Sequence, residues 1–421
     1  MRLLAFFKFF IVAAVFVQAG VAPALSSVTA GPPTFSQPVD YGPEVTGAQY
    51  VTIGDVLHRG ISDLVVTHAN DNFGHVSLLL GTGRGTFGLP RRIFLGTIQE
   101  EVVRAKLADV NGDGNPDLVI LTRDNGGGVF ITVALGDGKG GFRKTSQTRV
   151  NVNNLITDFV VAKFRPDPFP DVFVQAPFLL PAFILRSDGR GGFSTVLQLP
   201  YGGGAGGLVA ADVNHDGLLD LIGIGQSPFI FFTEQLQTLF GTGDGRFFAA
   251  PRYSAPGLQE SQSTGNNTGV TAAAGDLRSS GNTDLVVFGA DSQFGLSVVG
   301  QIYLGHADGS FDPPLLLPIA ARGVRANAAA VADLNGDGIP DIVIASANPG
   351  PSAPFGTYIL RGVGDGTFPV ELQTQVPVAP LFPSVTIADL NGDGRPDIVI
   401  TDQTSNRGVW VLLNTTLKRQ R

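Results

Sequence analysis

The chain has 421 residues, of which 15% are charged and 56 are glycine, and it contains no cysteine. The formal net charge is −8, and no basic stripe runs through the sequence, so we exclude nucleic-acid binding. The lack of cysteine excludes a thiol nucleophile and disulfide bonds, and the five histidines show no HExxH or similar metal-binding pair. We therefore assign no catalytic residue from the sequence.

Residues 1–30 are typical of an export signal. Arg2 and Lys8 give the segment a positive start, residues 9–25 are almost entirely apolar, and the small residues at 28–30 offer a cleavage site. Cleavage further upstream and an uncleaved anchor are the alternatives, although the apolar run is short for a membrane span. We expect a secreted, periplasmic or cell-surface protein with no transmembrane segment in its mature chain.

Four nearly identical acidic loops, DVNGDGNPD, DVNHDGLLD, DLNGDGIPD and DLNGDGRPD, are the most informative motif. Oxygen-bearing side chains stand at positions 1, 3, 5 and 9, glycine at position 6 permits a tight turn, and the carbonyl of position 7 is free to coordinate. Three carboxylates this close together repel one another unless a cation lies among them, and calcium prefers six to eight oxygen ligands. The alternative is a set of solvated acidic turns.

We predict about four structural calcium sites from these loops. Unlike an EF-hand, each loop lacks the glutamate at position 12 and runs into an apolar segment, so we expect it to open a strand. The predicted ligand positions are Asp109, Asn111, Asp113, Asn115 and Asp117; Asp212, Asn214, Asp216, Leu218 and Asp220; Asp333, Asn335, Asp337, Ile339 and Asp341; and Asp389, Asn391, Asp393, Arg395 and Asp397.

Three weaker copies of the loop begin at positions 55, 163 and 276, and they share one chemical change. Arginine replaces an oxygen ligand in each of them, as Arg59, Arg165 and Arg278. A guanidinium group placed between the two flanking aspartates can neutralise them in place of an ion. We predict this internal ion pair, with solvent-facing arginines as the alternative, and leave open whether these loops bind metal.

A glycine-rich segment that ends in phenylalanine follows each of the first six loops. No helical pattern comes after it, so it predicts a hairpin turn and not a phosphate-binding loop. We expect the phenylalanine to fill the space between neighbouring units. The six residues are Phe87, Phe142, Phe193, Phe247, Phe311 and Phe368.

Seven units of about 50 residues, each with four short strands, are typical of a β-propeller. The seventh unit ends near Asn414 without its phenylalanine-led strand, whereas residues 34–43 look like one. We therefore expect an all-β, seven-bladed β-propeller over residues 31–416, in which the N-terminal strand completes and closes the last blade. Residues 417–421 are expected to form a tail.

The acidic loops and glycine turns resemble the FG-GAP and VCBS-type repeats, the calcium-loop propeller of the integrin alpha head and of many secreted bacterial proteins. The resemblance covers roughly residues 33–416. It implies that the four complete loops carry the metal ligands given above. It also implies adhesion or ligand binding, which a fold alone does not establish.

We expect a monomeric extracellular recognition module for a carbohydrate or a protein, with a lyase-like polysaccharide-active enzyme as the alternative and a purely structural role as a third option. His215 is expected to be a turn residue and Trp410 a packing residue, while the polar insertion at residues 253–270 is either a contact loop or an idle one. Ligand contacts are expected on the face opposite the acidic loops, at residues 67–75, 122–128, 290–295, 347–356 and 402–408.

Overall fold

The fold is that of a computed structural model. The described residues are 31–417 except 43–44, 69–73, 96–99, 151–157, 176–181, 200–205, 227–233, 251–252, 255–257, 260–270, 292–297, 318–324, 348–355, 377, 379, 381–382 and 404–407. The predicted signal, residues 1–30, and the tail beyond residue 417 lie outside them.

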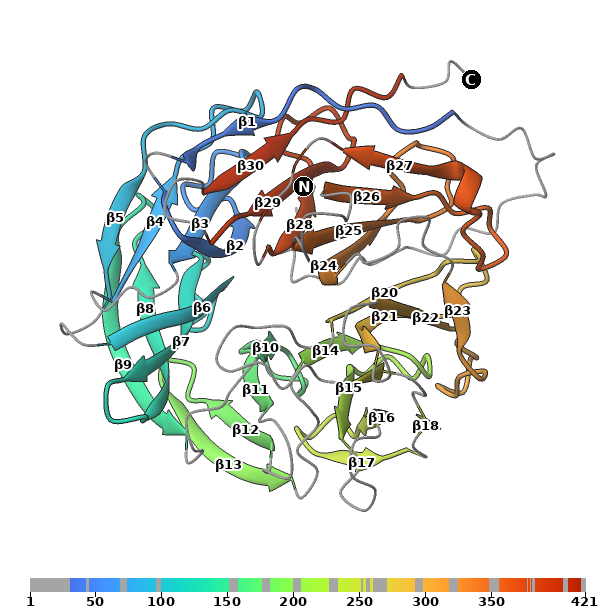
Figure 1. The fold of residues 1–421 in the computed structure, drawn as a ribbon. Coiled ribbons are helices and arrows are strands. Elements are labelled where there is room, and N and C mark those ends of the chain that lie inside the picture. The colour runs from blue at the N-terminus through green and yellow to red at the C-terminus, as the bar shows by residue number, and fades with distance from the viewer. Residues whose placement is uncertain are drawn as a thin grey trace, which may run out of the picture.

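The described strands form seven antiparallel sheets arranged around a ring, six of them built from strands that follow one another in sequence (Figure 1). Blade 1 contains β2 (Ala48–Gly54), β3 (Asp63–His68), β4 (His75–Leu79) and β5 (Arg91–Phe94). Blade 2 contains β6 (Glu100–Ala108), β7 (Asp117–Asp124), β8 (Val129–Gly136) and β9 (Phe142–Val150). Blade 3 contains β10 (Asp158–Ala162), β11 (Asp171–Gln175), β12 (Ala182–Ser187) and β13 (Phe193–Leu199).

The next blades carry two additional short strands at the position of the predicted insertion. Blade 4 contains β14 (Gly206–Ala211), β15 (Asp220–Gln226), β16 (Glu234–Gly241), β17 (Phe247–Ala249) and β18 (Tyr253–Ser254). Blade 5 contains β19 (Leu258–Gln259), β20 (Thr271–Gly275), β21 (Asp284–Asp291), β22 (Val298–Tyr303) and β23 (Leu315–Leu317). Residues 260–270 of the insertion lie outside the described residues.

The last two blades complete the ring. Blade 6 contains β24 (Arg325–Ala332), β25 (Asp341–Ala347), β26 (Gly356–Leu360), the short 3₁₀ helix η2 (Val370–Leu372) and β27 (Gln373–Val376). Blade 7 contains β28 (Val385–Ala388), β29 (Asp397–Thr401), β30 (Val409–Leu412) and β1 (Val39–Asp40). The predicted all-β, seven-bladed β-propeller is confirmed.

The outermost strand of blade 7 comes from the beginning of the described chain. β1 pairs antiparallel with β30, with Val39 opposite Val411, and the two strands lie side by side in Figure 1. A further bridge joins Phe35 to Asn414, and the Ser36 amide donates to the Leu413 carbonyl at 2.8 Å. Residues more than 370 positions apart in sequence therefore share one sheet.

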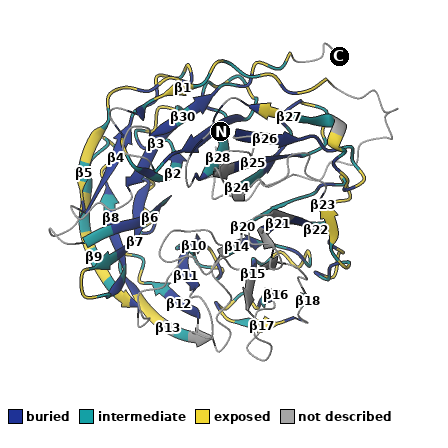
Figure 2. Cartoon of the chain, viewed as in Figure 1, coloured by how far each residue is buried: buried dark blue, intermediate teal, exposed yellow. Residues whose placement is uncertain are grey.

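Each acidic loop ends where the second strand of a blade begins, as predicted, because the position-9 aspartate is the first residue of that strand in every blade. The apolar run that follows is buried on both faces of the sheet, since another blade packs on each side; β3, β11 and β29 are buried throughout. Burial falls toward the outer strands, and β5 is mostly exposed (Figure 2).

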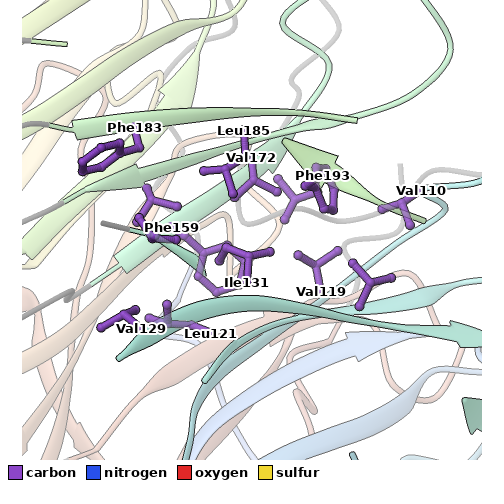
Figure 3. Close-up of a cluster of buried hydrophobic side chains, with 14 of the residues drawn as sticks. Val110, Val119, Leu121, Val129, Ile131, Phe159, Val172, Phe183, Leu185 and Phe193 are labelled. Carbon is purple, nitrogen blue, oxygen red and sulfur yellow. The ribbon is translucent and has the colours of Figure 1, made fainter. Parts of the chain in front are cut away.

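The hydrophobic core consists of seven clusters, one between each pair of adjacent blades. Figure 3 shows the cluster between blades 2 and 3, where Val119 and Leu121 of β7 face Val172 of β11. Every cluster receives one phenylalanine that begins or closely precedes an outer strand, and Phe35 takes this place between blades 6 and 7. The predicted packing role is confirmed for Phe142, Phe193, Phe247, Phe311, Phe368 and Phe87.

Candidate metal centre in the acidic loops

The acidic loops join the first and second strands of each blade, and the glycine turns join the third and fourth, so both lie on one face of the ring. We call it the loop face. The position-9 aspartate connects the two: Asp117 accepts hydrogen bonds from the Gly136 amide at 2.8 Å and the Val110 amide at 2.9 Å. The bond from the amide at or just after the end of the third strand, here Gly136, recurs in all seven blades. The bond from the amide of loop position 2, here Val110, recurs in six of them. This aspartate is fully buried in every blade and holds the loop against the turn.

The first part of each loop wraps its backbone around the position-1 carboxylate. Asp109 accepts hydrogen bonds from the Gly112 amide at 2.7 Å and the Gly114 amide at 2.9 Å. Both glycines have a positive φ, 77° and 85°, which a residue with a Cβ adopts only at a cost. His215 occupies the position of Gly112 in blade 4 with a φ of 58°, so its predicted role as a turn residue is confirmed.

Three carboxylates lie close together in each of the four complete loops. Burial first, and then the charges of the position-1 and position-5 aspartates, raise the pKa of Asp117, Asp220 and Asp397 to about 6 and that of Asp341 to about 7. The three acids of each loop thus lie close enough to disfavour one another's ionisation. In blade 4, Asp212 also has one buried oxygen without a hydrogen-bond partner.

The donor chemistry of these four loops fits a hard divalent cation, because each offers three carboxylates, an asparagine oxygen and a backbone carbonyl. The asparagine is engaged elsewhere: the Asn111 amide group donates to Asp113 at 3.0 Å, and the Asn111 oxygen accepts from the Asp113 amide. Within the described ranges, no group of three or more His, Asp or Glu side chains stands assembled as a metal cluster.

The three arginine-bearing loops form the predicted ion pair. Arg59 lies 2.7 Å from Asp63, Arg165 lies 2.7 Å from Asp171, and Arg278 lies 2.8 Å from Asp284. Burial raises the pKa of Asp63 and of Asp284, and the neighbouring arginine opposes this rise. In the complete loops the neighbouring charges are carboxylates, which add to the rise.

One detail of that prediction is wrong, because the arginine does not bridge both flanking aspartates. In blades 1 and 5 it pairs with position 9, and the position-1 carboxylate is satisfied by backbone amides instead. Asp55 accepts from the Gly60 amide at 2.6 Å, and Asp276 accepts from the Gly281 amide at 2.7 Å. The loop backbone already supplies these donors, so no side chain is needed at that carboxylate.

The loop of blade 7 combines features of both types. Arg395 was predicted to contribute only its carbonyl at position 7, but its guanidinium pairs with Asp393 and also donates to the Asn414 carbonyl at 2.9 Å. The presence of an arginine inside the nine-residue loop was the signal available in the sequence, because arginine marks the three weaker copies as well. A metal ion at this loop would have to compete with the Arg395 guanidinium for Asp393.

The opposite face is described only in part. At residues 122–128, the Asp124 side chain accepts hydrogen bonds from the Gly126 and Gly128 amides at 2.9 and 2.6 Å, which forms a tight turn. The central residues of the other four predicted contact loops lie outside the described residues. Trp410 packs into the cluster between blades 6 and 7, which confirms its predicted packing role. Among the described residues, no helix is long and apolar enough to cross a membrane.

Fold and loops together define a β-propeller built from repeated acidic-loop units. The model of the FG-GAP-like repeat matches residues 55–120, 109–174, 276–344 and 333–400, which together span more than half of the chain. The protein therefore belongs to the FG-GAP repeat family. None of the curated proteins compared with it matches the chain in sequence.

The comparison with solved structures finds similar chains at low sequence identity. BBS1N in complex with ARL6DN is 12% identical, with a TM-score of 0.57 over 92% of this chain and 99% of that one. An Agrocybe aegerita lectin that recognises non-reducing terminal N-acetylglucosamine is 19% identical, with a TM-score of 0.49 over 77% of this chain and 79% of its own. Rhamnogalacturonan lyase YesW is 16% identical, with a TM-score of 0.49 over 93% of this chain and 76% of its own.

Proposed function

We propose that the protein is a calcium-stabilised recognition module that acts outside the cytoplasm as a monomer and binds a carbohydrate or a protein. One contrast carries the calcium part. In four blades other carboxylates raise the pKa of the buried position-9 aspartate, and in two of the remaining blades an arginine opposes that rise. A divalent cation in the four complete loops would do what the guanidinium does elsewhere.

Bound calcium would neutralise the clustered acids and hold each loop in one geometry. The ligands in each complete loop would be the side chains of positions 1, 3, 5 and 9 and the carbonyl of position 7, after the position-3 asparagine turns its oxygen away from the backbone. The site would therefore support the loop face and not a reaction. In blade 7 the Arg395–Asp393 pair would weaken the same site.

We further infer that the β1–β30 pairing closes the ring. A propeller whose last blade lacks its outer strand leaves an unpaired edge, and closure removes it. The hydrogen bonds between residues 34–36 and 413–416 support this inference because they tie the two segments together beyond the paired strands.

The recognition part rests on the roles of the loop-face acids, which would bind a cation or pair with an arginine. This leaves the opposite face for a ligand. The BBS1N propeller is seen with a protein bound, and we extend the proposal of a protein or carbohydrate ligand to this chain. No described contact favours the lyase-like alternative. The one serine–histidine hydrogen bond that suggests a nucleophile, Ser77 with His68 at 2.9 Å, is buried, since Ser77 is only 1% exposed.

Two measurements test the proposal. Native mass spectrometry after calcium loading is expected to show four bound ions, three tight and one weaker; no bound ion, or seven equivalent ones, would contradict the calcium assignment. A glycan array screened in calcium and again in EDTA tests carbohydrate recognition. Calcium-dependent binding to a defined glycan class supports it. If no glycan binds but four ions do, carbohydrate recognition is refuted and the calcium assignment is retained.

A further inference from the structure

The innermost strands of blades 2 and 3 carry an unusual group of charges. Of the other innermost strands, β2, β14, β20 and β28 contain no charged residue, and β24 contains only Arg325. Strand β6 of blade 2, by contrast, carries Arg104 and Lys106, and strand β10 of blade 3 begins with Asp158. Figure 1 shows β2, β6 and β10 on the inner side of the ring.

Contacts join these residues across three blades. Arg104 pairs with Asp158 of blade 3, and its guanidinium carbon lies 3.9 Å from the ring centre of Tyr50 in blade 1. The Lys106 ammonium lies 5.5 Å from the ring centre of Phe159. The side chains of Arg104 and Asp158 are 18% and 16% exposed, so the cluster is largely desolvated.

Charge within this cluster is not balanced. Two cations share one carboxylate, and Lys106 forms no ion pair with any residue that the structure describes. The Nε atom of Arg104 is buried without a hydrogen-bond acceptor. Burial lowers the pKa of Lys106; the charge of Asp158 opposes this shift, and the smaller effect of Arg104 adds to it. A partly desolvated cation without a partner costs free energy, and an anion bound beside it would offset that cost.

Arg104 and Lys106 are two residues apart in one strand, so their side chains leave the strand on the same side. We propose that they form a binding site for a small anion with a carboxylate or phosphate group, on the inner strands of blades 1 to 3. Tyr50 and Phe159 hold the two cations in place from either side through their ring faces. Packing of Lys106 on Phe159 alone would explain its position, but not the excess positive charge or the buried Arg104 Nε without an acceptor.

The site is separate from the acidic loops and from the opposite face, so its test does not depend on the proposed function. Isothermal titration and thermal unfolding would be followed with two probes, inorganic phosphate and glucuronate, in calcium-loaded protein freed of excess calcium. Sodium chloride at equal ionic strength is the control. We expect one probe to bind and raise the melting temperature beyond the chloride effect, which also identifies the preferred anion.

Lys106→Met is expected to lower the affinity at least tenfold, whereas Lys139→Met, at an exposed lysine in the glycine turn of blade 2, is expected to leave it unchanged. If Lys106→Met does not fold, as judged by circular dichroism, Lys106→Gln takes its place. The proposal is overturned if neither probe binds the native protein more strongly than chloride does, or if the Lys106 variant binds as tightly as the Lys139 variant.

Discussion

Replacing Asp212 by asparagine gives a sharp test of the calcium sites, because the change should have opposite effects with and without calcium. Asp212 accepts one hydrogen bond, from the Gly217 amide at 3.0 Å, and its other oxygen is buried without a partner. Asparagine keeps the acceptor and has nearly the same shape. The substitution therefore removes a charge from the blade 4 loop without removing a described hydrogen bond.

In calcium, the variant should be less stable. At millimolar calcium and a dissociation constant of about 0.1 mM, typical of extracellular modules, one site contributes about 1.4 kcal/mol to the free energy of unfolding. Losing it should lower the melting temperature on the order of 2 °C. In EDTA, the variant should be more stable by about 1 kcal/mol, the Coulomb energy of two unit charges roughly 4 Å apart in water, because Asp220 loses a repelling neighbour.

The pH dependence follows from the same carboxylates. The pKa of Asp220 is raised from 3.8 to about 6 in the folded protein, so the folded state binds more protons than the unfolded state between these values. Without calcium, stability should therefore increase as the pH falls from 7.5 toward about 5, by about 1.4 kcal/mol for one loop. This gain should be smaller in Asp212→Asn.

Urea unfolding in calcium and in EDTA, at pH 7.5 and 5.5, measures all of these effects. Asp276→Asn is the matched control, since it changes position 1 of an arginine-bearing loop and should act equally in both conditions. The reasoning fails if Asp212→Asn has the same effect with and without calcium, or if the calcium-free protein loses stability between pH 7.5 and 5.5.

Three further predictions concern arginine and asparagine side chains. Arg278→Met should cost about 3 kcal/mol in calcium and in EDTA alike, because it leaves the fully buried Asp284 unpaired; a loss below about 1 kcal/mol in urea unfolding contradicts the ion-pair role. Arg395→Ala should raise the calcium affinity of the blade 7 loop up to about fivefold by freeing Asp393, and unchanged or weaker binding in calorimetry refutes the competition. Asn414, Thr415 and Thr416 form an N-glycosylation sequon. In a glycosylating host Asn414 should stay unmodified, because it is 1% exposed and its amide donates to the Leu334 carbonyl at 2.7 Å; a glycan found there by intact mass on folded protein disproves this.

The number of blades and the place of each acidic loop were predictable from the sequence, because both are local and periodic. All predicted ligands of a loop lie within its nine residues. The apolar run after position 9 predicts a buried strand without knowledge of its neighbours. The same holds for the phenylalanine after each glycine turn. Repetition makes such signals reliable, since seven copies report the same structural unit.

Contacts between distant residues were decided only by the tertiary structure. Nothing near Arg104 in sequence indicates that Asp158 and Tyr50 approach it from two other blades. The sequon at Asn414 does not itself indicate that Asn414 is buried in blade 7. Inside the loops, the sequence showed that arginine replaces a ligand, but the folded backbone decided which aspartate it pairs with, because amide groups satisfy the position-1 carboxylate in blades 1 and 5 first. Local patterns fix the blades, and the packing of blades against one another fixes the partners of each charge.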